Sequence, residues 1–336
     1  MDIKTKRRMV AILRILHDAP TSLGSERIAK ALELAGIELS ERAVRNYLAQ
    51  TDELGWTENL GRRGRRLTQR GLSELDGALV VDKVGFIAAK VDSLAYQMDF
   101  DLATRRGRVI MNVSTVALRD LKPAIRILYE VFRARLGMGR LAVVGLPGEL
   151  VGGFRTPPNC ACIGTVCSVS MNGVLLHANI ATHSRFGGLL ELSGGHPCRF
   201  TQIITYDGSS LDPLEIFIRG HMTRVLPAAQ TGEGTVGASF REVPAVALPE
   251  VLRITRETED AGLGGVLAMG SPNQPLLDVP VASGRVGLVL GGGLNPIAAV
   301  VESGISVTST AMSTLCDYQE LVDFRSLAAL AAKKTG

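Results

Sequence analysis

Arginine and asparagine at helical spacing are the first residues whose types suggest chemistry. Arg42, Arg45, Asn46 and Ala49 follow an i, i+3, i+4, i+7 pattern, which places them on one face of a helix. Arginine can donate two hydrogen bonds to guanine, and asparagine can pair with adenine in a similar way. An α-helix also fits the major groove. The spacing predicts a helix that reads base edges in double-stranded DNA, with Ser40 at its start.

A second basic group follows shortly after this helix. Residues 58–71, ENLGRRGRRLTQRG, hold five arginines and three glycines against the single acidic Glu58. GRRGRR predicts a β-turn, and LTQRGL predicts a returning strand. The hairpin would form a wing whose arginines contact phosphates or enter the minor groove. The alternative is a solvated turn whose charge serves solubility. The four arginines assigned to the wing are Arg62, Arg63, Arg65 and Arg66.

Two segments farther along contain groups that suit a small anion. Thr182, His183, Ser184 and Arg185 are consecutive, and an arginine is a natural clamp for a carboxylate. Asn295 follows three glycines in GGGLNPIAAV, where a strand is expected to lead into a helix with exposed backbone N–H groups. The alternatives are a structural ion pair for the arginine and a tight, well-capped turn for the glycine segment.

Cysteines offer a different chemistry. Cys160, Cys162 and Cys167 lie close together with histidines downstream, so thiolates and imidazoles could bind zinc. The spacing C-x-C-x4-C matches no standard zinc finger, and buried structural thiols are the preferred interpretation. Metal ligation by these cysteines stays the alternative. No serine or cysteine shows a nucleophile elbow, so we expect a protein that is not an enzyme and needs no cofactor.

The elements that must position the basic groups can be read from apolar spacing. Met9, Ile12, Leu13 and Leu16 predict a helix over residues 6–18. Ser25 and Ser40 suit the N-caps of two further helices, and the buried faces are expected to use the following residues: Ile28, Leu32, Val44 and Leu48. A short strand is expected around Trp56. Residues 1–76 therefore predict a winged helix-turn-helix domain.

The remainder, residues 77–336, is internally duplicated. GRVIMNVSTVAL from Gly107 matches GTVGASFREVPA from Gly234, and Ile180-Ala-Thr-His-Ser matches Ile305-Ser-Val-Thr-Ser. Two copies, about 85–210 and 211–336, each predict strand, helix and further strands. We expect an α/β (α+β) effector-sensing domain of two lobes with a cleft or shared sheet. The duplicated positions add three candidate anion-binding residues: Thr308, Ser309 and Thr310.

Charge and hydropathy restrict the class of protein. Residues 1–76 carry 14 Lys and Arg against 11 Asp and Glu, which concentrates most of the net charge of +4 in the first domain. Apolar runs are too broken or too short to span a bilayer. Five cysteines in a long chain without an export signal suit reduced thiols. These features predict a cytoplasmic protein with no membrane contact.

Six segments together carry a resemblance to a known family. They are LSERAVRNYL, LGRRGRRLTQRG, GTVCSVSMNGVLL, SRFGGLLEL, YDGSSLDPLEIFI and GGGLNPIAAVVESGI. They resemble the NrpR family of nitrogen-regulation repressors over nearly the whole chain. The resemblance implies a repressor that binds palindromic operators as a homodimer or higher oligomer and is released by 2-oxoglutarate. A different small carboxylate, or a metal or thiol signal at Cys160–Cys167, is the alternative.

Overall fold

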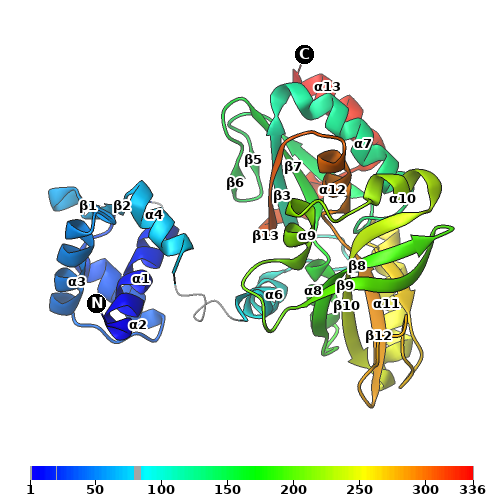
Figure 1. The fold of residues 1–336 in the computed structure, drawn as a ribbon, viewed down its shortest axis with the longest axis horizontal. Helices are drawn as coiled ribbons and strands as arrows, with labels where there is room; N and C mark the ends of the chain where they lie inside the picture. Colours follow the sequence, from blue (N-terminus) through cyan, green and yellow to red (C-terminus); the bar gives the residue numbers. More distant parts are fainter. Residues whose placement is uncertain (1, 20, 79–84, 336) are drawn as a thin grey trace. The chain divides into compact units, whose positions relative to one another are not determined.

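The chain separates into two compact units, residues 1–83 and 84–336 (Figure 1). The computed structural model describes residues 2–19, 21–78 and 85–335. The domain boundary expected after residue 76 lies at the end of helix α4 (Gln69–Asp76). Within the described ranges, no helix combines the length and the apolar character needed to cross a membrane.

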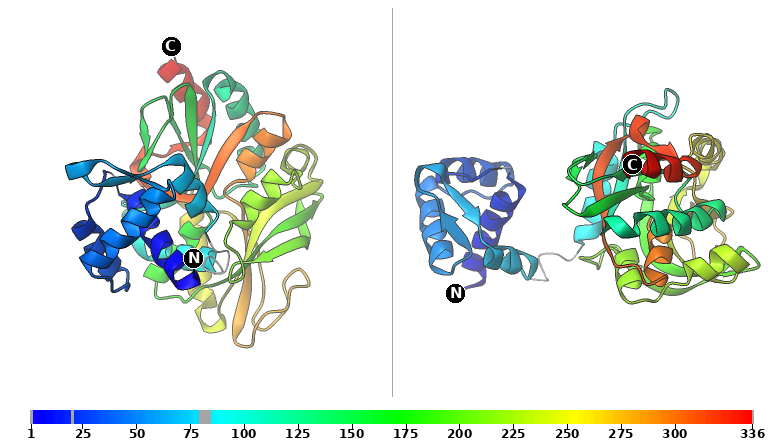
Figure 2. Two further views of the ribbon diagram at one scale, coloured as in Figure 1. Left: turned by 60° about the vertical axis from the view of Figure 1, so that its left-hand side comes forward. Right: turned by 90° about the horizontal axis from the view of Figure 1, so that it is seen from above.

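The first unit, drawn in blue in Figures 1 and 2, has four described α-helices and a small hairpin. Its elements before α4 are α1 (Ile3–Asp18), α2 (Ser25–Leu34), α3 (Glu41–Glu53), β1 (Thr57–Asn59), the turn η1 (Gly61–Arg63) and β2 (Arg65–Leu67). The predicted apolar stripes meet in one core, where Ile12, Ile28, Leu32, Val44 and Leu48 are fully buried. The winged helix-turn-helix prediction is confirmed.

Two local predictions in this unit were wrong. Gly24, rather than Ser25, occupies the N-cap of α2, and the Ser25 hydroxyl donates to Glu41 Oε1 at 2.9 Å. The returning strand ends at Leu67, because the Thr68 hydroxyl accepts the backbone N–H of Gly71 at 3.0 Å and thereby starts α4. LTQRGL is therefore mostly helical. A threonine that can cap a helix outweighs the strand pattern here.

The second unit contains the two sequence repeats as matching sets of elements. The first set is β3 (Arg108–Ala117), α7 (Leu121–Arg133), β4 (Leu141–Gly145), β7 (Cys160–Val166), α8 (Val169–His177) and β8 (His183–Ser193). The second set is β10 (Gly234–Pro244), α11 (Leu248–Asp260), β11 (Val266–Met269), β12 (Arg285–Gly291), α12 (Asn295–Glu302) and β13 (Val307–Asp317). The repeated sequences thus fold into the same element order.

Further elements surround these two sets. They are α6 (Phe86–Gln97), the hairpin β5 (Leu150–Val151) and β6 (Phe154–Arg155), β9 (His196–Thr205), α9 (Pro213–Arg219), α10 (Val225–Thr231), β14 (Val322–Asp323), the turn η5 (Phe324–Ser326) and α13 (Leu327–Thr335). Helix α6 packs on α8, and α13 packs on α7.

Each repeat donates its last strand to the sheet of the other. One sheet has the order β13-β3-β7-β4-β14, and the other has the order β11-β12-β10-β8-β9, with antiparallel neighbours. Strand β13 of the second repeat pairs with β3 of the first, and β8 of the first pairs with β10 of the second. The mixed α/β, two-lobe prediction is confirmed, and the lobes are joined by this reciprocal exchange.

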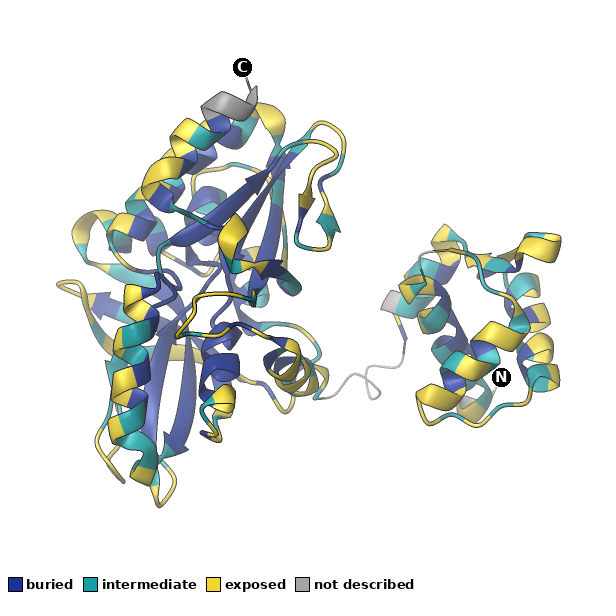
Figure 3. Ribbon diagram, turned by 180° about the vertical axis from the view of Figure 1, so that it is seen from behind, coloured by how far each residue is buried: buried dark blue, intermediate teal, exposed yellow. Residues whose placement is uncertain are grey.

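The sheets carry the core of the second unit. Figure 3 shows their strands as mostly buried, with exposed residues concentrated on the outer faces of helices and in turns. Strand β7 is buried from Ala161 to Val166, and β12 from Val286 to Gly291. Nearly continuous apolar strands are typical of sheets that are covered on both faces. Polar side chains buried in these strands therefore need a specific explanation.

Candidate DNA-reading face and effector site

Helix α3 presents the predicted polar face to solvent. Ser40 caps it, since its hydroxyl accepts the backbone N–H of Ala43 at 3.2 Å. Arg42, Arg45 and Asn46 are exposed on the side of the helix opposite to the buried Val44. The role of Ser40 in this structure is therefore to fix where the helix starts. Its position as a DNA-binding residue remains a prediction.

Arg45 has a partner on its own helix. Its Nη2 lies 2.8 Å from Glu41 Oε1 across one helical turn, and both side chains are more than two-fifths exposed. Hydrogen bonds from Ser25 and Arg45 hold the pKa of the Glu41 carboxyl below its ordinary value. The pair is solvated and weak. Arg45 thus lies on the outer face of α3. Its guanidinium can leave Glu41 for another acceptor at little cost in free energy.

The four wing arginines separate into different roles. Arg62 and Arg63 are exposed in the η1 turn, and their guanidinium groups have no partner among the described residues. Arg66 pairs with Glu58 at 2.9 Å on the exposed surface of the hairpin. These three arginines remain candidates for phosphate contacts.

Arg65 has a structural role in the hairpin, and its contact with DNA stays a prediction. Its Nε lies 2.8 Å from Asp52 Oδ2 at the end of α3, and its side chain is only 19% exposed. Its backbone also pairs with Leu23. Next to it, Gly64 has φ +91°, and a Cβ there would lie 2.4 Å from the Leu23 carbonyl. Both residues attach the hairpin to the helical core.

The expected anion clamp, Arg185, is already engaged. Its Nη1 donates to Glu242 Oε1 at 2.8 Å and to the Pro280 carbonyl at 2.5 Å. Glu242 is almost completely buried, with a side-chain exposure of 3%. Removing Arg185 would leave that carboxylate without its charged partner. The structural ion pair, one of the two sequence interpretations, is the one observed.

Asn295 is also a structural residue, so its assignment to effector binding is corrected. It is 1% exposed, and its amide bonds the N–H and carbonyl of Gly237 and the carbonyl of Leu136 at 2.6–2.8 Å. Leu294 occupies the N-cap instead. The matching residue in the other repeat, Ser170, bonds the N–H and carbonyl of Ile110 in the same way. Both side chains attach a helix to its neighbouring strand.

The remaining predicted residues lie in separate places. Thr182, His183 and Ser184 line a pocket of about 280 Å³ together with Asp92, Asp207 and Arg285. Thr308, Ser309 and Thr310 belong to β13 in the other sheet, where Ser309 Oγ lies 2.9 Å from Ser114 Oγ. The group at residues 182–184 and the group at residues 308–310 therefore belong to different sheets. None of the described pockets is lined by both groups.

The three clustered cysteines are free thiols in the described structure, and metal binding by them stays an alternative prediction. Cys162 and Cys167 are buried, and burial raises the pKa of their thiols to about 12 and about 11. Thiols with pKa values this high are protonated near neutral pH, as expected of buried structural cysteines. In the part of the chain that the structure describes, no three His, Cys, Asp or Glu side chains are arranged to hold a metal ion.

A residue that the sequence interpretation missed is the most unusual polar group of the second unit. Arg241 on β10 is 1% exposed, and its charge has no carboxylate partner among the described residues. Its Nε donates to Ser184 Oγ at 3.3 Å and its Nη2 to Ser168 Oγ at 3.2 Å, while Nη1 has no partner. Burial lowers the pKa of Arg241 from its ordinary value. An uncompensated buried cation costs several kcal/mol.

Other polar groups surround this guanidinium. Ser239 Oγ is buried without a partner, and Tyr206 is 4% exposed, with a pKa raised by burial. Ser168 occupies the N-cap of α8, where backbone N–H groups favour an anion. A cavity of about 20 Å³ next to Ser168 and Tyr206 is large enough for a water molecule. Together these groups form a buried polar centre around an uncompensated cation, and the buried Asp212 carboxylate lines the same small cavity.

Only one repeat has this cation. In the repeat alignment Arg241 matches Ser114, and the paired residues Arg241 and Ser184 match Ser114 and Ser309. The first sheet thus has two hydrogen-bonded serines where the second has an arginine. An arginine in a buried strand, at a position that is serine in the other copy, was the sequence signal for this site.

Comparison with known proteins shows which family the chain belongs to. Residues 84–323 match the family of NrpR regulatory domains NRD1 and 2. The chain belongs to the NrpR family. Residues 10–75 match the winged-helix domain of ribonuclease R, in agreement with the fold of the first unit.

Relatives of the chain support membership of the NrpR family. The global nitrogen regulator NrpRI of Methanosarcina mazei is 33% identical, with 96% of this chain and 99% of the relative covered. The global nitrogen regulator NrpR of Methanococcus maripaludis is 30% identical, with 93% and 54% covered, so the chain spans about half of that relative. The crystal structure of a nitrogen repressor-like protein from Methanococcus jannaschii matches with a TM-score of 0.60 and 27% identity, over 70% of this chain and 97% of that one.

Proposed function

We propose that this protein is a DNA-binding transcriptional repressor in nitrogen regulation that 2-oxoglutarate releases from its operator. Membership of the NrpR family and the names of its relatives support the regulatory role. The winged helix and the exposed face of α3 support DNA binding. Both matched families are regulatory or winged-helix domains, so the proposal contains no catalytic step and no cofactor.

The single observation that carries the effector part is the uncompensated charge of Arg241. A dianion such as 2-oxoglutarate would supply the missing carboxylate to Nη1, which has no partner at present. Ser239 and the start of α8 could donate further hydrogen bonds to the same carboxylate. The ligand would then remove an electrostatic cost that the free protein bears.

The pocket bordered by Thr182, His183 and Ser184 is the proposed entrance to this centre. Ser184 faces both places, because it lines the pocket and accepts a hydrogen bond from Arg241. Arg285 lines the same pocket, and its Nη1 is buried without a partner. A carboxylate that enters this pocket would meet the Arg285 guanidinium.

The DNA part of the proposal needs two copies of the chain. One winged helix contacts a half-site, and two α3 helices must lie about 34 Å apart to read a palindrome together. We therefore propose a homodimer or higher oligomer in the cytoplasm, with Arg42, Arg45 and Asn46 at base edges and Arg62, Arg63 and Arg66 at phosphates.

Calorimetry with 2-oxoglutarate tests the effector site directly. We expect Arg241→Gln to weaken binding at least about 100-fold, because a buried charged hydrogen bond is worth roughly 3 kcal/mol or more. Arg199→Gln is the matched control: Arg199 is an arginine of the same sheet, on β9, paired with Glu191 at 2.7 Å on the surface. Normal binding by Arg241→Gln would refute the site, and tighter binding of another dicarboxylate would refute the effector.

A further inference from the structure

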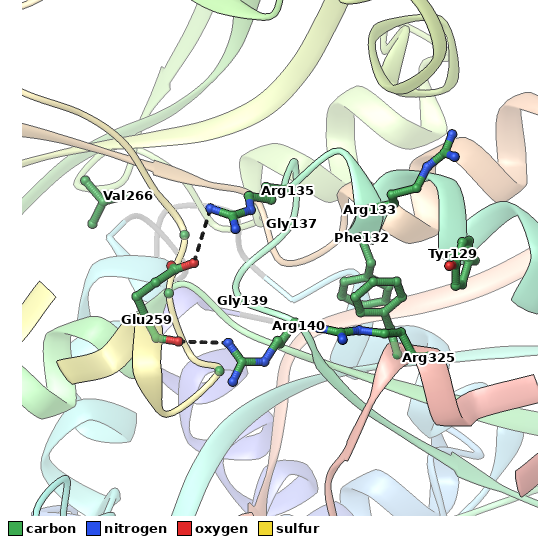
Figure 4. A pocket seen from close by; sticks show the side chains of 14 residues that line it. Tyr129, Phe132, Arg133, Arg135, Gly137, Gly139, Arg140, Glu259, Val266 and Arg325 are labelled. Atoms are coloured by element: carbon green, nitrogen blue, oxygen red, sulfur yellow. Dashed lines mark hydrogen bonds and ion pairs between the residues drawn. The ribbon is translucent and has the colours of Figure 1, made fainter. Parts of the chain in front are cut away.

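The largest described pocket of the second unit lies away from Arg241, where the two repeats meet (Figure 4). It has a volume of about 550 Å³ and lies between the end of α7, the end of α11 and the turn η5. Four arginines line it together with Tyr129 and Glu259: Arg133, Arg135, Arg140 and Arg325. No residue of the proposed effector site belongs to this lining.

One of the four arginines is a structural connection between the repeats. Arg140 Nε lies 3.2 Å from Asp323, and its two Nη atoms donate to the carbonyls of Glu259 and Asp260 at the end of α11. Its backbone N–H donates to Gly262 at 2.9 Å. Arg140 is therefore fully occupied and forms the rigid centre of the pocket.

The other arginines have weaker or shared partners. Arg135 is 85% exposed, and its Nη1 lies 3.8 Å from Glu259, too far for a hydrogen bond. Arg325 lies 3.1 Å from Asp323, the same carboxylate that Arg140 uses. Arg133 pairs with Glu130 on the surface. Four guanidinium groups thus share three carboxylates. The pocket therefore has an excess of positive charge that an added anion could neutralise.

The same pocket has an aromatic side. The Tyr129 ring is 39% exposed and lies 5.2 Å from the ring of Phe324, which in turn stacks on Phe132 at 5.5 Å. The Arg325 guanidinium lies over the Phe324 ring at 5.6 Å. A ring that stacks on Tyr129 would extend an existing aromatic cluster. Glycines at 137, 139, 262, 264 and 265 leave the rest of the lining without bulky side chains.

We propose that this pocket binds a nucleoside di- or triphosphate as a second ligand, separate from the effector. The phosphates would contact Arg135 and Arg325, since guanidinium groups bind phosphate through paired hydrogen bonds. The base would stack on Tyr129, as bases do on aromatic side chains. The volume lies within the range of small-molecule sites. Occupancy would bridge α7, α11 and η5 and so act on both repeats.

The test measures binding of ATP, ADP, inorganic triphosphate and adenosine to the full chain by calorimetry. We expect saturable 1:1 binding of ATP, weakened at least about 10-fold by the double change Arg135→Ala and Arg325→Ala. Arg119→Ala is the matched control, because Arg119 is 87% exposed and lies 3.8 Å from its own carboxylate, Asp120. Thermal melting of each variant verifies that it is folded.

A second pair of variants tests the aromatic side. Tyr129→Ala should weaken ATP binding but leave triphosphate binding unchanged, while Tyr96→Ala, a change at an 80% exposed tyrosine on α6, should affect neither. Three results would each overturn the proposal: no saturable ATP binding at about 1 mM, an equal loss in Arg119→Ala, or ATP binding that is lost in Arg241→Gln but kept in the double variant Arg135→Ala and Arg325→Ala. The last result would place ATP at Arg241.

Discussion

Two arginines of this protein show that the partner of a side chain decides its role. Arg65 lies in a dense basic segment, yet its pairing with Asp52 makes it part of the framework of the first unit. Arg241 lies in a buried strand, and the lack of a described carboxylate partner makes it the best candidate for ligand binding. Residue type and local spacing predict DNA contact for Arg65 and do not single out Arg241.

Asp212 allows a prediction about pH. It caps α9 by accepting the N–H groups of Leu214 and Glu215, and burial raises its pKa to about 6 from 3.8. The native state thus binds a proton more tightly than the unfolded state. The corresponding stability is present below pH 3.8 and is lost as pH rises through about 6.

Asp212→Asn keeps the cap and removes this titration. Relative to wild type, the variant should gain up to about 2–3 kcal/mol of unfolding free energy between pH 4 and pH 7, as an upper bound. Urea unfolding of the second unit followed by circular dichroism measures the difference. A constant difference between variant and wild type across this range would show that the pKa of Asp212 is not raised in the native state.

At the scale of elements, the wing is the clearest case for separating binding from stability. The double change Arg62→Ala and Arg63→Ala should weaken binding to any DNA and leave folding unchanged. The slope of log K for DNA binding against log salt concentration should become less steep by about 0.9 for each lost phosphate contact. Arg65→Ala should instead destabilise the first unit by about 1–2 kcal/mol, because Asp52 loses its partner.

Fluorescence makes the second half of this prediction measurable. Trp56 is the single tryptophan of the chain, and it is buried in the core of the first unit. Its emission therefore reports unfolding of that unit alone. If the salt dependence of DNA binding is unchanged in the double variant, Arg62 and Arg63 serve solubility instead of phosphate contact. If the unfolding midpoint of Arg65→Ala equals that of wild type, Arg65 does not stabilise the first unit.

Elements could be predicted from the sequence where the controlling interactions are local. The helix at Ser40 and the apolar faces of α1, α2 and α3 follow from a cap and from helical spacing. The exchange of β8 and β13 could not be predicted, because a strand pattern states which face is buried but not which strand is its neighbour. Asn295 was misassigned for the same reason, since its partners Gly237 and Leu136 are distant in sequence.

At the scale of the whole molecule, the proposed effector centre lies close to the first described helix of the second unit, α6. Helix α6 contributes Val91 to the pocket at Ser184 and to the small cavity at Ser168. Lys90 on the same helix donates to the Ala311 carbonyl at 3.3 Å. A ligand at Arg241 would therefore contact the element that leads to the DNA-binding unit. This arrangement supports a coupling between effector and operator, which must be reciprocal.

Operator release tests the central claim most directly. Full-length protein on labelled operator DNA is titrated with 2-oxoglutarate while anisotropy is recorded, for wild type, Arg241→Gln and Arg199→Gln. The account predicts release of wild type and of Arg199→Gln, with an operator affinity about 5- to 150-fold lower at saturating ligand. Arg241→Gln should bind the operator normally and stay bound. Release of Arg241→Gln at the same ligand concentration as wild type would contradict the account.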